Sequence, residues 1–427
     1  MSFVLKTLER LIDRHIRDIV LISRPIHKLQ FAYQPGKSTE AVLHHLVSKI
    51  ENTFDRKEVA LGVFLDIEGA FDNTSFTYIT QQAEKHGISS SLTRWIGHML
   101  SSREVSARLF DETVTIKTTR GFPQGGCLSP LPWCLVINGL IEKLNSLGSY
   151  TQGFADDISL YNSGSCESAV YELTQRSLGV VEEWCQESGL LVNPSKTSVV
   201  RFTKRRKLTD VNLKLFNQSL KLDKTVKYLG VTIDSTLTWL PHLSCVTEKA
   251  TRSFWACRSM VGRTWPEMAR WLYNQVILPR ITYGATVWWP AVNKVTCISK
   301  LNSIQRMANL TITGAMRSTP SAAMDVLVGL LPLHIKVREV TLSGAQRLIR
   351  LNLWCDRLSS PGHTQILKSC QSEWPKWRNS DNQIVKYYFE RMFEVAFPER
   401  SEWTEGSWHS RKTRSSSTLT PLKMVTV

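Results

Sequence analysis

Apolar residues recur at helical spacing at the start of the chain and then form a strand-like run. Leucine and isoleucine repeat every three or four positions through about residue 22, ahead of Pro25, which predicts an N-terminal helix. Residues 59–67 (VALGVFLDI) are almost continuously apolar and partly β-branched. Such a run predicts a buried strand, and this one ends on a carboxylate at Asp66.

The same pattern divides the chain into a mixed region and a helical region. Strands alternate with helices up to about residue 235 and helices dominate afterwards, which indicates an α+β domain followed by a smaller helical one. Helices are predicted at 74–100 with a break at Gly87, from Ser129-Pro130 onward, over 166–188 and through most of 240–352. Strands or hairpins are predicted at 105–109 with 113–118, at 151–161 with a turn at Asp156-Asp157, at 197–202 and at 225–234.

The composition favours a globular protein that binds nucleic acid in a reducing compartment. The 427 residues carry 53 Lys and Arg against 37 Asp and Glu, a formal net charge of +16. This charge attracts polyanions, although a basic, solvated surface is the plainer alternative. The nine cysteines form no C-x-x-C pair and no zinc-type spacing, and the N-terminus lacks the apolar core of a signal peptide. No run approaches a membrane span, so we expect an intracellular protein of the nucleus and cytoplasm.

Three aspartates are candidate metal ligands. Asp66 ends an apolar strand, and Asp156 and Asp157 occupy a predicted turn between two short strands. A buried carboxylate is costly unless it is paired or bound to a cation. If these strand ends meet at one edge of a sheet, the carboxylates hold two divalent cations about 4 Å apart. Asp-Asp is also a common turn pair, so by itself the pair is weak support for catalysis.

Six sequence blocks give these aspartates a more specific context. In order they are QFAYQPGKST at 30–39, VFLDIEGAFDN at 63–73, RGFPQGGCLSPLPW at 120–133, FADD at 154–157, GLLVNPSKT at 189–197 and KYLGVTID at 227–234. The series resembles the reverse transcriptases of non-LTR retrotransposons, close to the jockey-like elements, over about residues 3–350.

The resemblance implies a right-hand polymerase of the α+β class. Truncated fingers and a palm with an antiparallel sheet are expected at 1–235. A helical thumb or connection is expected at 236–370, and a weakly structured C-terminal tail at 371–427.

The resemblance also implies roles for the residues around the aspartates. Asp66, Asp156 and Asp157 are implied to be catalytic and to hold two Mg²⁺ ions, with the carbonyl of Ile67 beside them. Phe71 is implied to be a steric gate, because a bulky ring beside the sugar would exclude a 2′-hydroxyl. Plain core packing is the alternative for Phe71.

Further roles follow for three loops. Gln124 is implied to contact the incoming nucleotide, and Gly125 to shape the loop beneath the template base. Lys196 resembles the residue that protonates the leaving pyrophosphate, the alternative being a solvated lysine in a turn. The segment Tyr228-Leu229-Gly230 resembles the primer grip, a hairpin that presses the primer 3′ end toward the metals.

The expected function is RNA-directed DNA synthesis from a primer 3′-hydroxyl during retrotransposition. The expected partners are an RNA template, the element's own RNA, a DNA primer and deoxynucleoside triphosphates, with no membrane. The chain starts just past a basic R-P-I-S-type segment of the family, which implies that the endonuclease and part of the fingers are absent and that extension is weak.

Two alternatives remain at this stage. One is a catalytically impaired remnant that only binds nucleic acid. The other is a palm-type nucleotidyl cyclase, and the PQG and KYLG blocks argue against it, because a cyclase needs neither a template loop nor a primer grip.

Overall fold

The computed structural model describes most of the chain up to the end of the helical region. It describes residues 3–110, 112–123, 125–206, 208–209, 212–261, 266–355, 362–370, 372 and 384–386, without the side chains of 109, 112 and 257–261. The predicted tail at 371–427 therefore lies almost entirely outside the described residues, and so does Gln124.

A six-stranded sheet forms the centre of the first half of the chain. It contains β1 (Val59–Glu68), β4 (Tyr150–Phe154), β5 (Asp157–Gly164), β6 (Leu191–Val192), β7 (Ser198–Phe202) and β10 (Leu222–Asp223). The order is β10-β7-β1-β5-β4, with β6 paired to the end of β1, and only the pair of β10 with β7 is parallel. β1 is nearly continuously apolar because it is the central strand and both of its faces are covered.

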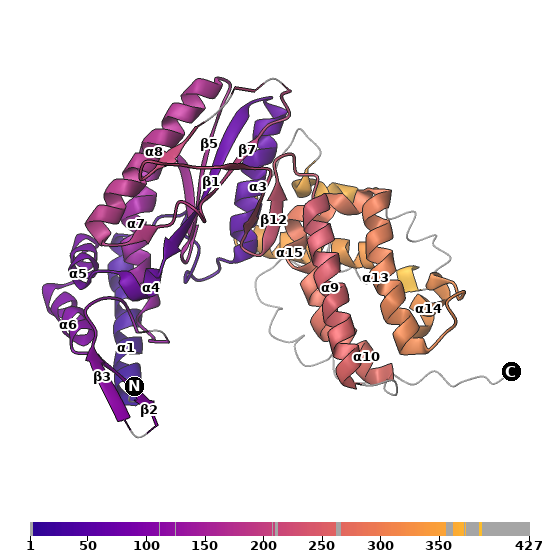
Figure 1. Cartoon of the computed structure of the whole chain (residues 1–427), viewed down its shortest axis with the longest axis horizontal. Helices are drawn as coiled ribbons and strands as arrows, with labels where there is room; N and C mark the ends of the chain where they lie inside the picture. The colour runs from indigo at the N-terminus through magenta and orange to yellow at the C-terminus, as the bar shows by residue number, and fades with distance from the viewer. Residues whose placement is uncertain are drawn as a thin grey trace, which may run out of the picture.

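Helices that follow or precede the sheet strands cover one of its faces. α7 and α8 lie directly against the strands, on the same side of the sheet in Figure 1. Their buried side chains, with those of α5, α6 and the N-terminal helix, form one core cluster around Trp133 and Trp184. These helices are α1 (Phe3–His15), α5 (Phe76–Lys85), α6 (Ser90–Ser101), α7 (Pro130–Ser146) and α8 (Glu167–Ser188).

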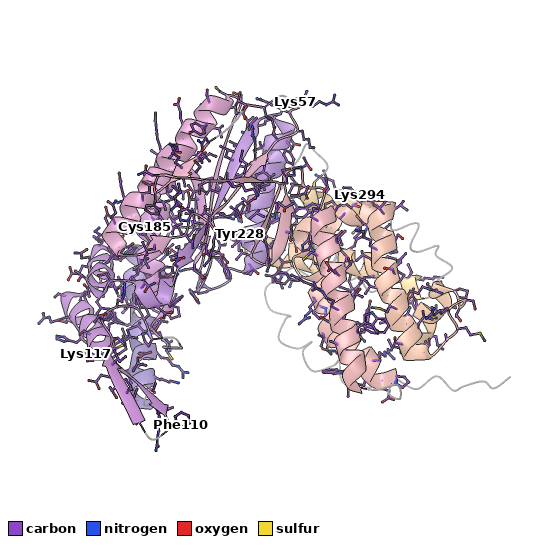
Figure 2. The ribbon with its side chains drawn as sticks, in the orientation of Figure 1. Lys57, Phe110, Lys117, Cys185, Tyr228 and Lys294 are labelled. Atoms are coloured by element: carbon purple, nitrogen blue, oxygen red, sulfur yellow. The ribbon has the colours of Figure 1, made fainter. Side chains whose placement is uncertain are left out.

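The N-terminal helix and a projecting hairpin lie beyond one end of the sheet. α1 continues through a π-helical turn, η1 (Ile16–Val20), into α2 (Leu21–Ser23), and the helix ends before Pro25 as predicted. β2 (Glu104–Leu109) and β3 (Glu112–Lys117) pair as an antiparallel hairpin. Its tip carries Phe110, far from the sheet (Figure 2).

The opposite face of the sheet is covered by α3 (Thr39–Asp55). Ser38 caps this helix by accepting a hydrogen bond from the Ala41 N–H at 3.3 Å, as expected for a serine at that position. Glu40 in the first turn bonds to Thr286 and Arg347 of the helical region. α3 therefore joins the sheet to the helices that follow it.

The second half of the chain is a helical region that shares its core with α3. A single cluster of buried residues runs from α3 to Trp288 and Ile366. Two further tryptophans, Trp255 and Trp271, are exposed. The region contains α9 (Leu240–Val261), α10 (Pro266–Leu272), η2 (Tyr273–Ile277), α11 (Leu278–Thr282), α12 (Ala285–Trp288), η3 (Trp289–Asn293), α13 (Val295–Thr313), α14 (Ser321–Val328), α15 (Leu333–Arg350) and η4 (His363–Gln365).

A buried row of hydrogen bonds ties the last described helical turns to α3. The Cys355 N–H donates to His44 Nε2 at 2.8 Å, and His44 Nδ1 lies 2.8 Å from His363 Nε2. His363 Nδ1 lies 3.0 Å from Glu51 Oε2, and the His363 backbone N–H donates to Glu51 Oε1 at 2.9 Å. We call His44, His363 and Glu51 the histidine chain. Both imidazoles are fully buried and Glu51 is 9% exposed.

The predicted architecture is confirmed, with two local corrections. An α+β palm with an antiparallel sheet is followed by a helical thumb, and β12 (Val231–Asp234) and α9 lie on either side of residue 235. The exact three-domain division stays a prediction. β1 does not end at Asp66 but continues to Glu68, because Ile67 and Glu68 pair with β6. The turn after β4 is Ala155-Asp156, since Asp157 already pairs as the first residue of β5.

Candidate active site

Strand register brings Asp66 and Asp157 together. Asp66 on β1 lies directly opposite Asp157 on β5, and cross-strand partners in an antiparallel pair project from the same face. Asp156 is the neighbouring residue in the β4–β5 turn. The turn is closed by Ala155 in a left-handed conformation (φ 56°), which costs on the order of 1–3 kcal/mol for a residue other than glycine. We call Asp66, Asp156 and Asp157 the aspartate site.

The three carboxylates repel one another. Burial, followed by the charges of Asp156 and Asp66, raises the pKa of Asp157 to about 6. The Asp157 side chain is nevertheless exposed at the surface, so solvent screening reduces the energetic weight of this shift. A cluster of like charges with net negative charge is an unfavourable arrangement for stability and suits a site that binds cations.

Lys196 is held beside this cluster by the turn at 193–196. The Asn193 N–H donates to the Asp66 carbonyl at 3.1 Å, and the Lys196 N–H donates back to the Asn193 carbonyl at 3.2 Å. Lys196 Nζ lies 3.5 Å from Asp66 Oδ2, and both side chains are about half exposed. An exposed pair of this kind contributes little to stability, so the lysine is free to act on a bound group.

Phe71 lies in the short helix α4 (Ala70–Asn73) that follows β1. Its ring centroid is 6.0 Å from that of Phe122 and 5.5 Å from that of Trp133, and the side chain is half-buried. One side of the ring therefore packs on the core while the remainder stays accessible. Ile67, by contrast, is buried, so only its backbone is available for the role predicted for it.

The glycine-rich loop at 120–129 is fastened to α4. The Phe122 N–H donates to the Phe71 carbonyl at 2.6 Å, and the Gly121 N–H donates to the Thr74 carbonyl at 2.8 Å. A Cβ at Gly121 would lie 2.4 Å from the Asp72 carbonyl oxygen, so this close approach requires glycine. Gly125 has open space around it but adopts φ 80°, which also favours glycine. The predicted nucleotide contact Gln124 lies outside the described residues.

In the segment Tyr228-Leu229-Gly230, Tyr228 ends β11 (Thr225–Tyr228), and Leu229 and Gly230 form the turn to β12. Tyr228 is 3% exposed and its hydroxyl lies 3.3 Å from Ser159 Oγ on β5, and burial raises the pKa of that hydroxyl. It lies between the sheet and the helical region in Figure 2. The hairpin turn is thus packed on the strand that begins with Asp157.

Three residues have contacts here that sequence reasoning did not predict, although Tyr283 was expected among the aromatic residues of the thumb. Tyr33 lies close enough to Asp156 for the carboxylate to raise its pKa, after the larger effect of burial. The Tyr283 hydroxyl donates to the Leu229 carbonyl at 3.0 Å. Glu9 of α1 accepts a hydrogen bond from the Cys127 N–H at 2.7 Å. These contacts join segments far apart in sequence, and no local pattern signals them.

Comparison with known proteins shows the family of the chain. Residues 1–233 match the family "Reverse transcriptase (RNA-dependent DNA polymerase)". The chain belongs to the reverse transcriptase family. This reverse transcriptase chain is similar to polymerases of non-LTR retrotransposons, as predicted.

Similar proteins come mainly from insect mobile elements. A "Probable RNA-directed DNA polymerase from transposon BS" of Drosophila melanogaster is 29% identical over 72% of this chain and 34% of its own length. The "RNA-directed DNA polymerase from mobile element jockey" of Drosophila funebris is 26% identical over 80% of this chain and 38% of its own. The chain spans about a third of the length of these relatives. Among solved structures, telomerase from Candida albicans aligns over 91% of this chain and 58% of its own, with a TM-score of 0.42 and 11% identity.

Reverse transcriptases generally use divalent metal ions, and the aspartate site has suitable donors. Oxygen ligands and uncompensated negative charge are what hard cations such as Mg²⁺ prefer. The side chains do not form a closed ligand set: within the described ranges, no group of three or more His, Cys, Asp or Glu is arranged to hold a metal ion. The donor chemistry fits the cation, and the repulsion at Asp157 is what cation binding would relieve.

No helix in the described part of this reverse transcriptase is long and apolar enough to cross a membrane.

Proposed function

We propose that this chain extends the 3′-hydroxyl of a DNA primer on an RNA template, as part of retrotransposition. The observation that carries the proposal is the aspartate site, in which Asp66 and Asp157 are cross-strand partners and Asp156 occupies the adjoining turn. Three adjacent carboxylates at the exposed end of a sheet suit phosphoryl transfer, where positioning and charge stabilisation provide most of the catalysis.

The aspartates would hold two Mg²⁺ ions, which supply charge stabilisation for the transferring phosphoryl group. Lys196 Nζ, held 3.5 Å from Asp66 Oδ2, would donate a proton to the departing pyrophosphate oxygen. Phe71 has one side fixed against Phe122 and Trp133 and the other accessible, which suits a gate against the ribose 2′-hydroxyl.

Two loops would position the substrates. In the loop at 120–129, Gln124 would contact the incoming deoxynucleoside triphosphate, and Gly125 would shape the loop beneath the template base. The Tyr228-Leu229-Gly230 turn would grip the primer, because it packs on β5 through Tyr228 and is held from the other side by Tyr283. The carbonyl of Ile67 would complete the metal ligands.

The formal charge of +16 supports polyanionic partners. We propose an RNA template, a DNA primer and the element's own RNA as these partners, and the nucleus and cytoplasm as the places of action.

Primer extension tests the proposal. Purified chain is given poly(rA), an oligo(dT) primer, Mg²⁺ and dTTP above about 1 mM, the top of the usual KM range. We expect DNA synthesis that disappears in Asp66→Asn and persists in Asp18→Asn, which alters an exposed aspartate on the N-terminal helical run. Primer–template binding without any extension by the wild-type chain would favour the alternative of a remnant that only binds nucleic acid.

Sugar selection tests the role of Phe71 separately. Replacing Phe71 by Val removes the ring, so incorporation of ribonucleotides relative to deoxyribonucleotides should rise roughly 10- to 100-fold, the usual weight of one steric discrimination. An unchanged ratio in an active variant would leave Phe71 as a packing residue only.

A further inference from the structure

The carboxylate of Glu9 is completely buried, although α1 otherwise exposes many of its side chains to solvent. Its Oε2 accepts from the Cys127 N–H at 2.7 Å and from the Leu128 N–H at 3.3 Å. Among the described residues, its Oε1 has no hydrogen-bond partner. A buried carboxylate with one unpaired oxygen lowers stability relative to an apolar residue, so stability alone does not account for Glu9.

The two N–H groups that Glu9 binds belong to the glycine-rich loop. They come just before α7, which begins at Pro130 after the N-cap position Ser129. The N-terminal end of a helix carries partial positive charge, and free backbone N–H groups near it attract an anion. Glu9 provides that anion from a helix more than a hundred residues away in the sequence.

The loop is therefore held at both of its ends. At the first end, Gly121 and Phe122 donate to backbone carbonyls of Thr74 and Phe71, and Arg103 Nη2 donates to the Gly121 carbonyl at 2.6 Å. At the second end, the loop is held by Glu9. Between these two ends the loop has hydrogen bonds of its own, because Gly126 N and Ser129 Oγ both donate to the Pro123 carbonyl.

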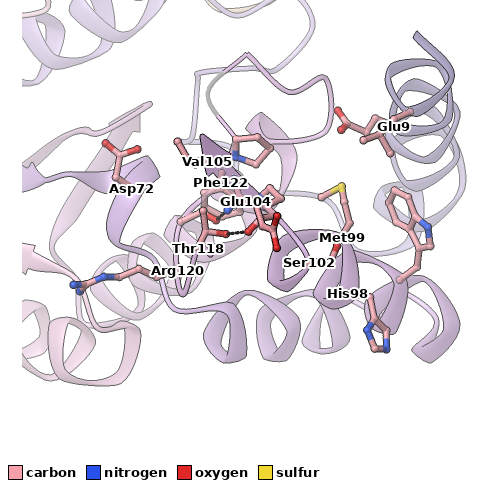
Figure 3. Close-up of a pocket in the computed structure, with 15 residues that line it drawn as sticks. Glu9, Asp72, His98, Met99, Ser102, Glu104, Val105, Thr118, Arg120 and Phe122 are labelled. Carbon is pink, nitrogen blue, oxygen red and sulfur yellow. Dashed lines mark hydrogen bonds between the residues drawn. The ribbon is translucent and has the colours of Figure 1, made fainter. Parts of the chain in front are cut away.

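The two attachments lie on different sides of a cavity of about 1070 Å³. Figure 3 shows Glu9 on the N-terminal helix at one side of this cavity and Asp72 at the opposite side, with Phe122 between them. Phe122 and Leu128 anchor the loop by packing into the core cluster. Between these two side chains, the hydrogen bonds decide where the loop backbone lies.

We propose that Glu9 is a positioning residue for the substrate loop: through the Cys127 and Leu128 N–H groups, α1 sets where the loop presents its nucleotide-binding residues. The proposal rests on the proposed function for its effect on nucleotide use, but not for the attachment itself. Glu9 does not touch the reacting atoms. Loss of the attachment loosens the loop beside the Phe71 gate and weakens nucleotide binding before it affects chemistry or primer–template binding.

The attachment is tested by hydrogen–deuterium exchange in the intact chain. In Glu9→Ala, a peptide that contains Cys127 and Leu128 should exchange faster, because both amides lose their acceptor. Glu9→Gln keeps an acceptor oxygen and should restore part of the protection. Asp18→Ala is the matched control, because it removes an exposed carboxylate of the same helical run. Unchanged exchange in Glu9→Ala would overturn the proposal.

The consequence is tested by steady-state kinetics on poly(rA) with oligo(dT). Glu9→Ala should raise the KM for dTTP roughly 10-fold or more, since a hydrogen bond to a charged group is lost. The kcat and the primer–template Kd should change by less than about threefold, and Glu9→Gln should recover part of the KM. Two outcomes would show a purely structural role and overturn the proposal. One is faster loop exchange with an unchanged KM. The other is a rise in both KM and the primer–template Kd together with a fall in kcat and Tm.

Failure of the proposed function gives a different pattern. If the wild-type chain makes no DNA, hydrogen–deuterium exchange of the loop is measured instead. The chain is then bound to poly(rA) with a dideoxy-terminated oligo(dT) primer, with and without dTTP. Protection of the 125–131 region by dTTP in the wild type, lost in Glu9→Ala and regained in Glu9→Gln, supports the positioning role. Equal protection by dTTP in the wild type and Glu9→Ala, or no protection in either, overturns it. Glu9→Asp and Glu9→Gln serve the same comparisons if Glu9→Ala does not fold.

Discussion

The aspartate site and the histidine chain use similar side chains in opposite ways. At the aspartate site three like charges lie together at the exposed end of the sheet, and the pKa of Asp157 is raised. In the histidine chain every link has a partner: Cys355 donates to His44, and the chain ends on the Glu51 carboxylate. Both imidazoles are fully buried, and burial, then the charges of His363 and His45, hold the pKa of His44 well below its usual range.

The difference separates a functional site from a structural one. Unmatched charge is retained where a ligand is to be bound, and it reduces stability until that ligand arrives. Buried groups that all have hydrogen-bond partners hold the surrounding side chains in one arrangement. Removing one member leaves its buried partner without a hydrogen bond, and this lowers stability. The same kind of substitution should therefore change activity at one place and stability at the other.

The largest expected effect is on catalysis at the aspartate site. Under the proposed function, Asp156→Asn removes a ligand of the Mg²⁺ ions and should lower primer extension by at least about 10³-fold. Its Tm should not fall and should rise slightly, since one of the repelling charges is removed. Extension assays paired with thermal unfolding measure both. A large drop in Tm would contradict the view that these charges oppose folding.

The next effect is on stability at the histidine chain. Glu51→Ala leaves the His363 Nδ1 and backbone N–H groups without their acceptor, so the free energy of unfolding should fall by about 3 kcal/mol. Chemical denaturation measures it. Glu183→Ala, which replaces an exposed glutamate in the C-terminal part of α8, should change this free energy by less than about 0.5 kcal/mol. A loss of similar small size in both variants would mean that the chain is not a structural element.

Lys196 allows the comparison to be sharpened within the aspartate site. Lys196→Ala removes the cation 3.5 Å from Asp66, and extension should fall about 100-fold if its proton is used on the leaving group. Stability should change by less than about 1 kcal/mol, because both side chains are about half exposed. Single-turnover kinetics would separate chemistry from product release. A loss that appears only in nucleotide KM would assign Lys196 to binding instead.

The smallest effect is a pH dependence of opposite sign at the two places. The lowered pKa keeps His44 neutral in the folded chain, so the unfolded chain binds more protons below about pH 6.5. The contribution of neutral His44 to the free energy of unfolding is therefore lost as pH falls, by at most about 2 kcal/mol at pH 5. Asp157 has a raised pKa of about 6, so its repulsion is fully present above that value and is relieved as pH falls toward about 4.

The two contributions can be separated by substitution. Asp157→Asn removes the relief on acidification, so unfolding free energy should fall more steeply from pH 7 to 5 than in the wild type. His44→Gln should make the same curve shallower. The ionisable groups around His44 are His45, His363 and Glu51, and each variant leaves them in place. A flatter curve in Asp157→Asn would show that the site aspartate has no such effect.

Local sequence patterns predicted most elements, because short-range physics decides them. The helix break at Gly87, the hairpin 104–117 and the cap at Ser38 follow from turn and capping preferences that act within a few residues. The two corrections, at the end of β1 and at the β4–β5 turn, come from pairing with β6 and from strand register. Pairing partners lie far away in sequence, and a strand end therefore cannot be read from its own residues.

By itself the sequence determined the order of blocks, the carboxylates at 66 and 156–157, and the change from a mixed to a helical region, since these depend on residue type and spacing. Only the tertiary structure decided which side chains meet. Glu9 reaches a loop more than a hundred residues away, and His44 meets His363 across more than three hundred. Such contacts depend on how α1 packs beside the loop before α7 and how α3 packs between the sheet and the helical region. Hydrophobic packing is not directional enough for these contacts to be inferred from a pattern alone.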